Sequence, residues 1–297
     1  MKDRYYFEQS HLMGDGCVYF WKLSSELYPI LIYFNHHKEP EIVQVMQGTL
    51  HLYVDNQDTI LHKGDIAIIN SGQFHHGVKE GEETCIVNVY VLDLKELSTG
   101  NNVSNGPIFD ALYKNRIWFT PFLYPDSIGY NEILPILSSM EQLWRKRQTG
   151  WEMQMKSLFF GLLYLFFSHS DDLLLKHTSM DVKSHDKQQK MQKLIDYLEE
   201  HYTERITVAE MADYLYMGAD NFYKFMVSLT GESPITFVNH FRLLKAVNLL
   251  QTTEIPITEI SLSCGFPNIS YFSRCFRKYY GCTPRQIRST ARDENKN

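Results

Sequence analysis

The chain has 297 residues and a formal net charge of −6, and 44% of its residues are hydrophobic. This length predicts about two domains with ample core, and the composition excludes a disordered or fibrous protein. The 5 cysteines are scattered and form no Cys-x-x-Cys pair, which argues against a disulfide framework or a cysteine metal site.

Nothing in the sequence predicts export or membrane insertion. The N-terminal residues lack the apolar segment of a signal peptide. The longest apolar run, residues 158–167, is shorter than the roughly 20 residues that span a bilayer. We therefore expect a cytoplasmic protein with reduced cysteines and no membrane partner.

Residues 10–95 predict short strands separated by turns. The strand candidates are rich in β-branched and aromatic residues, and turn residues such as Gly48, Gly64 and Gly72 separate them. They lie at 17–23, 28–34, 41–46, 49–54, 59–61, 65–69 and 84–92. Closely spaced strands of this kind indicate a small barrel or jelly roll.

Two polar groups in this region resemble the two motifs of a cupin barrel. The first reads His37-Lys-Glu-Pro-Glu41, then six residues, then Gly48. The second reads Gly64-Asp65 and then Asn70-Ser-Gly72-Gln-Phe-His75. Metal-binding cupins hold their metal with two His and a Glu of the first motif and a His of the second. The resemblance implies that the matching positions here are Asn35, His37, Glu41 and His75.

One of these four positions is therefore Asn. Three His and Glu ligands could still bind a metal, they could line an effector site, or they could be structural. Tyr33, His37, Glu41 and His75 would present polar groups inside an apolar barrel, which suits a sugar-like effector.

Two helices are predicted after the barrel, at 130–147 and 151–168, separated by Gly150. A loop-rich stretch at 103–130, with a short helix at 108–114, precedes them. The two helices either cover the barrel or form the seam of a homodimer. Residues 171–188 are polar and predict a linker, and a helix at 189–202 then opens the second domain.

The end of the chain predicts two helix-turn-helix units, at about 207–230 and 257–280. Residues 222–234 align with 272–284 at an offset of 50, and upstream Met211 matches Ile260 at an offset of 49. The offset between the two units changes by one residue in the turn, where Gly265 supplies conformational freedom. The second unit has its apolar residues at helical spacing: Ile257, Ile260, Cys264, Phe272, Cys275, Phe276 and Tyr279.

A connecting helix is predicted between the units. Ser233-Pro234 is an N-cap followed by Pro at the first helical position, and the helix runs from Ile235 to about Leu250. At 1.5 Å per residue its length is roughly 24 Å. Two units spaced in this way could enter successive major grooves, about 34 Å apart.

The region 190–290 resembles the DNA-binding domain of the AraC/XylS transcription regulators. The matching residues are Arg242, Lys245-Ala246, Leu249-Leu250, Ile260, Gly265-Phe266, Tyr271-Phe272-Ser-Arg274, Phe276-Arg277-Lys278, Gly281 and Thr283-Pro284-Arg285. The first unit departs from the family pattern at Gly218, Asp220 and Met226-Val227.

The charge distribution agrees with this resemblance. Residues 1–185 hold 15 Lys and Arg against 22 Asp and Glu, whereas residues 186–292 hold 13 against 11. An acidic half beside a mildly basic half is typical of a sensor joined to a DNA reader. A helical hairpin with a solvated basic face is the plain alternative for the end of the chain.

We therefore expect an α+β protein with a cupin-like ligand-binding and dimerisation domain at 1–170, a linker at 171–188 and a DNA-binding domain at 189–292. The resemblance implies an effector-controlled activator that binds double-stranded DNA and contacts RNA polymerase as a homodimer. The alternative is a metal-dependent cupin enzyme with a helical accessory domain. That alternative needs a full ligand set and leaves the duplicated units unexplained, so we expect no enzyme, no bound metal and no cofactor.

Exposed polar residues of the two second helices are the candidate DNA contacts. We expect bases to be read by Asn221, Tyr223, Lys224, Asn268, Ser270, Tyr271 and Arg274. Phosphate contacts are expected from Arg277, Lys278 and Arg285.

Overall fold

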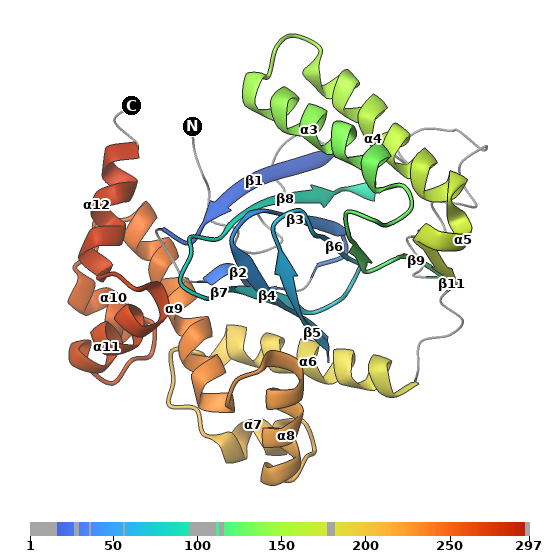
Figure 1. Ribbon diagram of the computed structural model, residues 1–297. Coiled ribbons are helices and arrows are strands. Elements are labelled where there is room, and N and C mark those ends of the chain that lie inside the picture. Colours follow the sequence, from blue (N-terminus) through green and yellow to red (C-terminus); the bar gives the residue numbers. More distant parts are fainter. Residues whose placement is uncertain are drawn as a thin grey trace.

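A computed structural model of the protein describes residues 17–26, 30–35, 37–55, 57–94, 111–112, 116–176 and 182–294. Strands fill the N-terminal part and helices the C-terminal part (Figure 1). The α+β architecture predicted from the sequence is therefore confirmed.

Two antiparallel sheets form the N-terminal barrel. The first has the strand order β1-β8-β3-β6-β10 and the second the order β2-β7-β4-β5. The strands are β1 Val18–Ser24, β2 Ile30–Asn35, β3 Glu41–Gln47, β4 Thr49–Val54, β5 Gln57–His62, β6 Ile66–Ile69, β7 His75–Glu80, β8 Ile86–Leu92 and β10 Phe122–Leu123. The sequence predicts all of them except β7 and β10. β7 reads His-His-Gly-Val-Lys-Glu and has no apolar run, and pairing with β2 and β4 holds it in the sheet.

The first sheet is buried on both faces. Val43 and Val89 are paired across β3 and β8 and belong to the core inside the barrel. Their neighbours Ile42 and Tyr90 are also paired and belong to a second core, which includes residues of the helices outside. Successive strand residues point to opposite faces, so a sheet covered on both sides needs a near-continuous apolar sequence.

Two helices cover the outer face of this sheet, α3 (Tyr130–Lys146) and α4 (Trp151–Ser168) (Figure 1). Both match the helices predicted from the sequence. Their buried residues recur at helical spacing: Ile133, Leu137, Met140, Met155, Phe159, Leu162, Leu163 and Phe166. In the part of the chain that the structure describes, no helix combines the length and apolar character needed to cross a membrane.

Residues 171–176 of the predicted linker, 171–188, lie in a short helix and a short strand. α5 (Ser170–Leu173) is followed by β11 (Leu174–Lys176), which pairs with β9 (Ile117–Phe119) beside the barrel. α6 (Val182–His201) then begins earlier than the helix predicted from residue 189. Most of the short helix predicted at 108–114 lies outside the described residues.

The C-terminal helices form two helix-turn-helix units on a connecting helix. The first unit is α7 (Val208–Tyr214) and α8 (Ala219–Thr230), and the second is α10 (Ile257–Ser263) and α11 (Ile269–Tyr280). α9 (Pro234–Thr252) joins them and begins at the predicted cap, where Ser233 accepts a hydrogen bond from Thr236 N–H. α12 (Pro284–Glu294), which the sequence analysis did not predict, adds Ile287 to the core of the second unit.

The two turns differ at one equivalent position. Gly265 has φ +80°, and a Cβ there would lie 2.2 Å from the carbonyl oxygen of Tyr202. Arg242, from α9, donates to that same carbonyl over 2.7 Å, so the second turn is packed against the end of α6. In the first unit the equivalent residue is Tyr216, which has φ +55° and is 96% exposed. Only the second turn therefore needs glycine for space as well as for φ.

The barrel lies between two groups of helices. α3 and α4 lie on the side of β1 and β8, and the C-terminal helices lie on the opposite side, next to the sheet that contains β2, β7, β4 and β5 (Figure 1). The second sheet therefore faces the two helix-turn-helix units.

Candidate DNA interface and effector site

The second helix of each helix-turn-helix unit, α8 and α11, is called a reading helix below. α11 buries Phe272, Phe276 and Tyr279 on one face. The polar residues predicted to contact DNA lie on its other faces. Ser270, Arg274, Arg277 and Lys278 are exposed, as is Arg285 at the start of α12. Positive groups there are available to phosphates.

Two of the predicted contacts in α11 also bond within the protein. Asn268 is the N-cap, and its side chain accepts from Tyr271 N–H over 2.8 Å. The hydroxyl of Tyr271 accepts from the Asn239 side chain of α9 over 2.9 Å, and the Arg274 guanidinium lies 5.5 Å from the Tyr271 ring centroid. The Asn239–Tyr271 bond fixes the start of α11 on the connecting helix.

The first reading helix has a weaker start. Its N-cap is Gly218, which has no side chain to accept a hydrogen bond, and Asp220 lies in the first turn. Asn221, Tyr223 and Lys224 are exposed on α8, so the structure leaves all three available to a partner.

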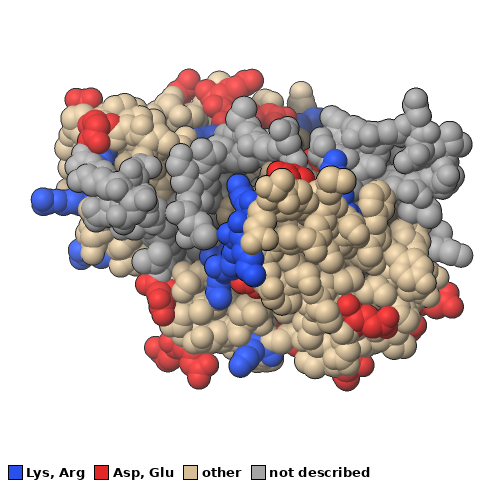
Figure 2. Space-filling view, turned by 90° about the horizontal axis from the view of Figure 1, so that it is seen from above, with Lys and Arg blue, Asp and Glu red and all other residues tan. Residues whose placement is uncertain are grey.

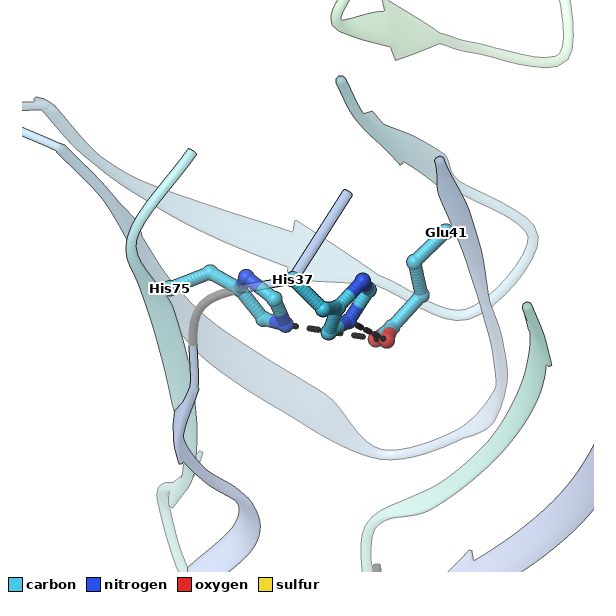
Figure 3. Close-up of side chains that lie close together, drawn as sticks. All are labelled: His37, Glu41 and His75. Carbon is cyan, nitrogen blue, oxygen red and sulfur yellow. Dashed lines mark hydrogen bonds and ion pairs between the residues drawn. The ribbon is translucent and has the colours of Figure 1, made fainter. Parts of the chain in front are cut away.

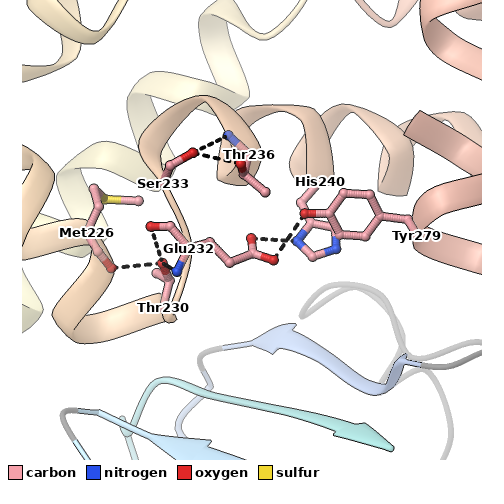
Figure 4. Close-up of polar contacts among 7 residues, drawn as sticks. All are labelled: Met226, Thr230, Glu232, Ser233, Thr236, His240 and Tyr279. Carbon is pink, nitrogen blue, oxygen red and sulfur yellow. Dashed lines mark hydrogen bonds and ion pairs between the residues drawn. The ribbon is translucent and has the colours of Figure 1, made fainter. Parts of the chain in front are cut away.

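A polar cluster that the sequence analysis did not identify joins the two units (Figure 4). Glu232, just after α8, accepts from the hydroxyl of Tyr279 in α11 over 3.0 Å and from Nδ1–H of His240 in α9 over 2.8 Å. The Glu232–His240–Tyr279 cluster therefore ties both reading helices to the connecting helix. Its members are far apart in sequence, so no local pattern reveals them.

Burial and hydrogen bonds together set the charges in this cluster. Burial alone would raise the pKa of Glu232, but the hydrogen bonds from His240 and Tyr279 outweigh it and lower that pKa. Burial also lowers the pKa of His240, despite the nearby carboxylate. We conclude that a neutral imidazole donates to an ionised carboxylate here.

Inside the barrel, the structure brings together three of the residues predicted from the cupin motifs (Figure 3). Nε2 of His37 lies 3.3 Å from Oε2 of Glu41, and Nε2 of His75 lies 3.6 Å from the same oxygen. All three side chains are buried, with Glu41 and His75 each 1% exposed. Tyr33 lies in β2, and its side chain falls outside the described part of the chain.

This His37–Glu41–His75 triad holds a buried charge. Burial would raise the pKa of Glu41, but His75 and His37 outweigh it and lower that pKa to about 2. Burial would lower the pKa of His75, yet Glu41 raises it. Nδ1–H of His75 donates to the carbonyl oxygen of Gln73 over 3.0 Å, which directs Nε2 towards Glu41. The triad is thus a preformed polar site in an apolar barrel.

The triad also has the donor set of a divalent-metal site. One ligand atom from each residue lies within 4.8 Å of the others. Imidazole nitrogen and carboxylate oxygen suit zinc, iron or manganese. Asn35 matches the fourth position of the cupin pattern, and its side chain lies outside the described part of the chain.

Comparison with known families agrees with both halves of the structure. A helix-turn-helix domain model matches residues 211–290, and a cupin domain model matches residues 32–92. The transcriptional activator RhaS of Mannheimia succiniciproducens is 24% identical over 256 residues, which cover 85% of this chain and 87% of that protein. RhaS of Shigella sonnei is 24% identical over 257 residues, which cover 86% of each.

Two solved structures are also similar to the chain. A regulator of Chromobacterium violaceum with an AraC-type DNA-binding domain is 27% identical, covers 35% of this chain and 93% of its own, and gives a TM-score of 0.34. ToxT of Vibrio cholerae is 15% identical, covers 92% of this chain and 98% of its own, and gives a TM-score of 0.49.

The two domain models match in the order expected from the sequence, and the RhaS relatives span both domains. The chain therefore combines an N-terminal cupin domain with a C-terminal helix-turn-helix domain, and over both domains it is a distant relative of the RhaS activators, as expected for a transcription regulator of the AraC type.

Proposed function

We propose that this protein is a transcription regulator that inserts α8 and α11 into two successive major grooves of DNA. A small molecule bound in the barrel would control this DNA binding. The observation that carries the proposal is the duplication itself, two helix-turn-helix units on one connecting helix, α9. A metal-dependent enzyme, the alternative considered from the sequence, is set aside because the chain is similar to transcriptional activators over both of its domains.

The exposed residues of the two reading helices would divide into two roles. Arg274 would read a base edge, because it is exposed in the middle of α11 and a guanidinium can bond to guanine with two donors. Lys278 and Arg277, in the last turn, would hold phosphates. On α8, base edges would be read by Asn221, Tyr223 and Lys224.

These roles can be separated by measuring affinity for a DNA site selected from a random pool, and for random DNA. Arg274→Ala should cost about 1–3 kcal/mol on the selected site and relax preference at one base pair. Lys278→Ala should weaken both DNAs alike and lower the salt slope by about one. An equal loss on selected and random DNA for both variants would refute the division.

We propose further that the effector is a hydroxylated, sugar-like molecule bound at the triad. Glu41 offers a buried carboxylate oxygen and the two imidazoles offer donors, which suits hydroxyl groups. A panel of monosaccharides and sugar alcohols should contain a compound that raises the melting temperature. At 100 times its Kd, that compound should increase the free energy of unfolding by about 2.7 kcal/mol. Glu41→Gln should remove this shift.

Elemental analysis separates this proposal from a metal site. We expect less than one tenth of an equivalent of zinc, iron or manganese, as an order of magnitude, in protein grown in metal-replete medium, because the proposal assigns the triad to an organic effector and one position of the four-ligand cupin pattern is Asn. One equivalent of metal that is lost in Glu41→Gln would contradict a direct role in effector binding.

The relatives named RhaS are transcriptional activators. By analogy we propose that this protein activates transcription and contacts RNA polymerase. A single-round transcription assay on a template that carries the selected DNA site should give more transcript with the protein than without it. Less transcript would contradict the assignment.

We also propose a homodimer formed through the outer face of α4. Met153, Phe160 and Tyr164 lie on that face and are 78%, 40% and 70% exposed. Figure 2 looks down on the side of α3 and α4 and shows a broad area with few charged side chains beside a row of Lys and Arg. An apolar stripe of this kind on a helix is suited to a second copy of the same helix.

A further inference from the structure

Three consecutive residues link the triad to the DNA-binding domain. His75 begins β7 and points to Glu41 inside the barrel. Phe74, immediately before it, is fully buried in the same hydrophobic core as Met191 and Leu194 of α6. One residue therefore belongs to the proposed effector site, and its neighbour belongs to the core of the first helix-turn-helix unit.

His76, on the other side of His75, also faces the C-terminal helices. Its ring stacks on that of Tyr53 in β4, with centroids 4.3 Å apart and planes at 4°. Tyr53 in turn lies beside Gly231, the C-cap residue of α8, because a Cβ added to Gly231 would lie 3.4 Å from the Tyr53 ring. Barrel strands lie directly below the cluster that contains Glu232 and His240 (Figure 4).

The turn before β7 is held rigidly. The Asp55 carboxylate accepts from Phe74 N–H over 3.1 Å and from the Gln73 side chain over 3.0 Å, and Asp55 N–H donates to the Phe74 carbonyl over 2.7 Å. Gly72 N–H donates to the carbonyl of His37 over 2.9 Å. These hydrogen bonds link the backbone next to His37 and His75 to Phe74, so a shift of either histidine would be expected to move Phe74 as well.

We propose that residues 74–76 are the positioning element through which occupancy of the triad sets the placement of the first reading helix, α8. This proposal rests on the proposed function and specifies its regulation. Effector would bind one arrangement of His75 and Glu41 better than another, and only such a difference in affinity can shift the arrangement of the reading helices.

The test is a double-mutant cycle read by hydrogen exchange in the full-length protein, with no DNA and no effector. Glu41→Gln alters the triad, and Phe74→Leu loosens the contact with the first unit while keeping an apolar side chain. Exchange is measured at the amides of α8 and of residues 231–233. The control is Phe159→Leu, because Phe159 is an equally buried phenylalanine in α4, on the other side of the barrel.

Glu41→Gln should change exchange in α8 by roughly 2- to 30-fold, the range of measured couplings between sites. The change should disappear in the Phe74→Leu background and persist in the Phe159→Leu background. His75→Asn is a second alteration of the triad and should behave as Glu41→Gln does. Within each background, exchange in α3 should be the same with and without the triad substitution, which shows that the barrel remains folded.

The proposal is overturned if Glu41→Gln and His75→Asn leave α8 unchanged, or if their effects are the same with and without Phe74→Leu. These outcomes are independent of DNA. If the wild-type protein bound a selected DNA site no better than random DNA, the proposed function would be refuted. The exchange response would still decide whether residues 74–76 couple the two domains.

Discussion

The hydroxyl of Tyr279, in one reading helix, donates over 3.0 Å to the carboxylate of Glu232, in the loop that ends the other. This bond joins the C-terminal ends of α8 and α11. Tyr279→Phe should therefore lower the free energy of unfolding by about 1.5–3 kcal/mol, the usual contribution of a hydrogen bond to a charged group. Chemical denaturation measures this, with the exposed Tyr214→Phe as control. Equal stability of the two variants would mean that the bond contributes nothing.

The two turns predict opposite effects of glycine. Gly265→Ala should destabilise by more than about 2 kcal/mol, because φ is +80° and the added Cβ would lie 2.2 Å from a backbone oxygen. Tyr216→Gly should stabilise by about 1 kcal/mol, because the tyrosine has φ +55° and its side chain is 96% exposed. Thermal unfolding of the two variants checks both signs, and a loss of stability in Tyr216→Gly would contradict the account.

The Glu232–His240–Tyr279 cluster predicts loss of stability in acid. The pKa of His240 is lowered in the folded protein, so the unfolded chain takes up a proton first as the pH falls through 6.5, and stability falls there. The pKa of Glu232 is also lowered, so its contribution is present above 4.5 and is lost below that pH. Both effects favour unfolding as the pH decreases.

His240→Gln keeps a donor for Glu232 but cannot titrate. The fall in unfolding free energy between pH 7 and pH 5 should therefore be shallower than in the wild type, by up to about 1.4 kcal/mol per pH unit. Denaturation at a series of pH values gives both slopes. Identical slopes would show that His240 does not titrate with folding.

The apolar stripe on α4 predicts a mutation that separates the dimer. Phe160→Glu should place a charge in the seam and give monomers at concentrations where the wild type is a dimer. Sedimentation velocity measures this, and Ile128→Glu is the control because Ile128 is 52% exposed outside α4. A wild type that sediments as a monomer would refute the dimer.

The parts predicted from the sequence depend on local patterns. Apolar spacing and turn residues place α3, α4 and both helix-turn-helix units, because those signals lie within each element. The cluster at Glu232 could not be predicted, since Tyr279 is 47 residues away. The bond from Asn239 to Tyr271 likewise spans 32 residues.

Two other features escaped prediction for different reasons. β7 has no apolar alternation and forms through pairing with β2 and β4. Asn268 was assigned to DNA, although an Asn directly before a helix also signals an N-cap, and the structure uses it as one. Its contact with DNA stays a prediction.

Above all, we propose that one chain reads two successive major grooves. Methylation-protection footprinting of the full-length protein on its selected DNA site tests it most directly. We predict two groups of protected guanines per chain on one face of the duplex, about one helical turn apart, with the group under α11 lost in Arg274→Ala. A single protected group per chain, or two groups on opposite faces of the duplex, would contradict the account.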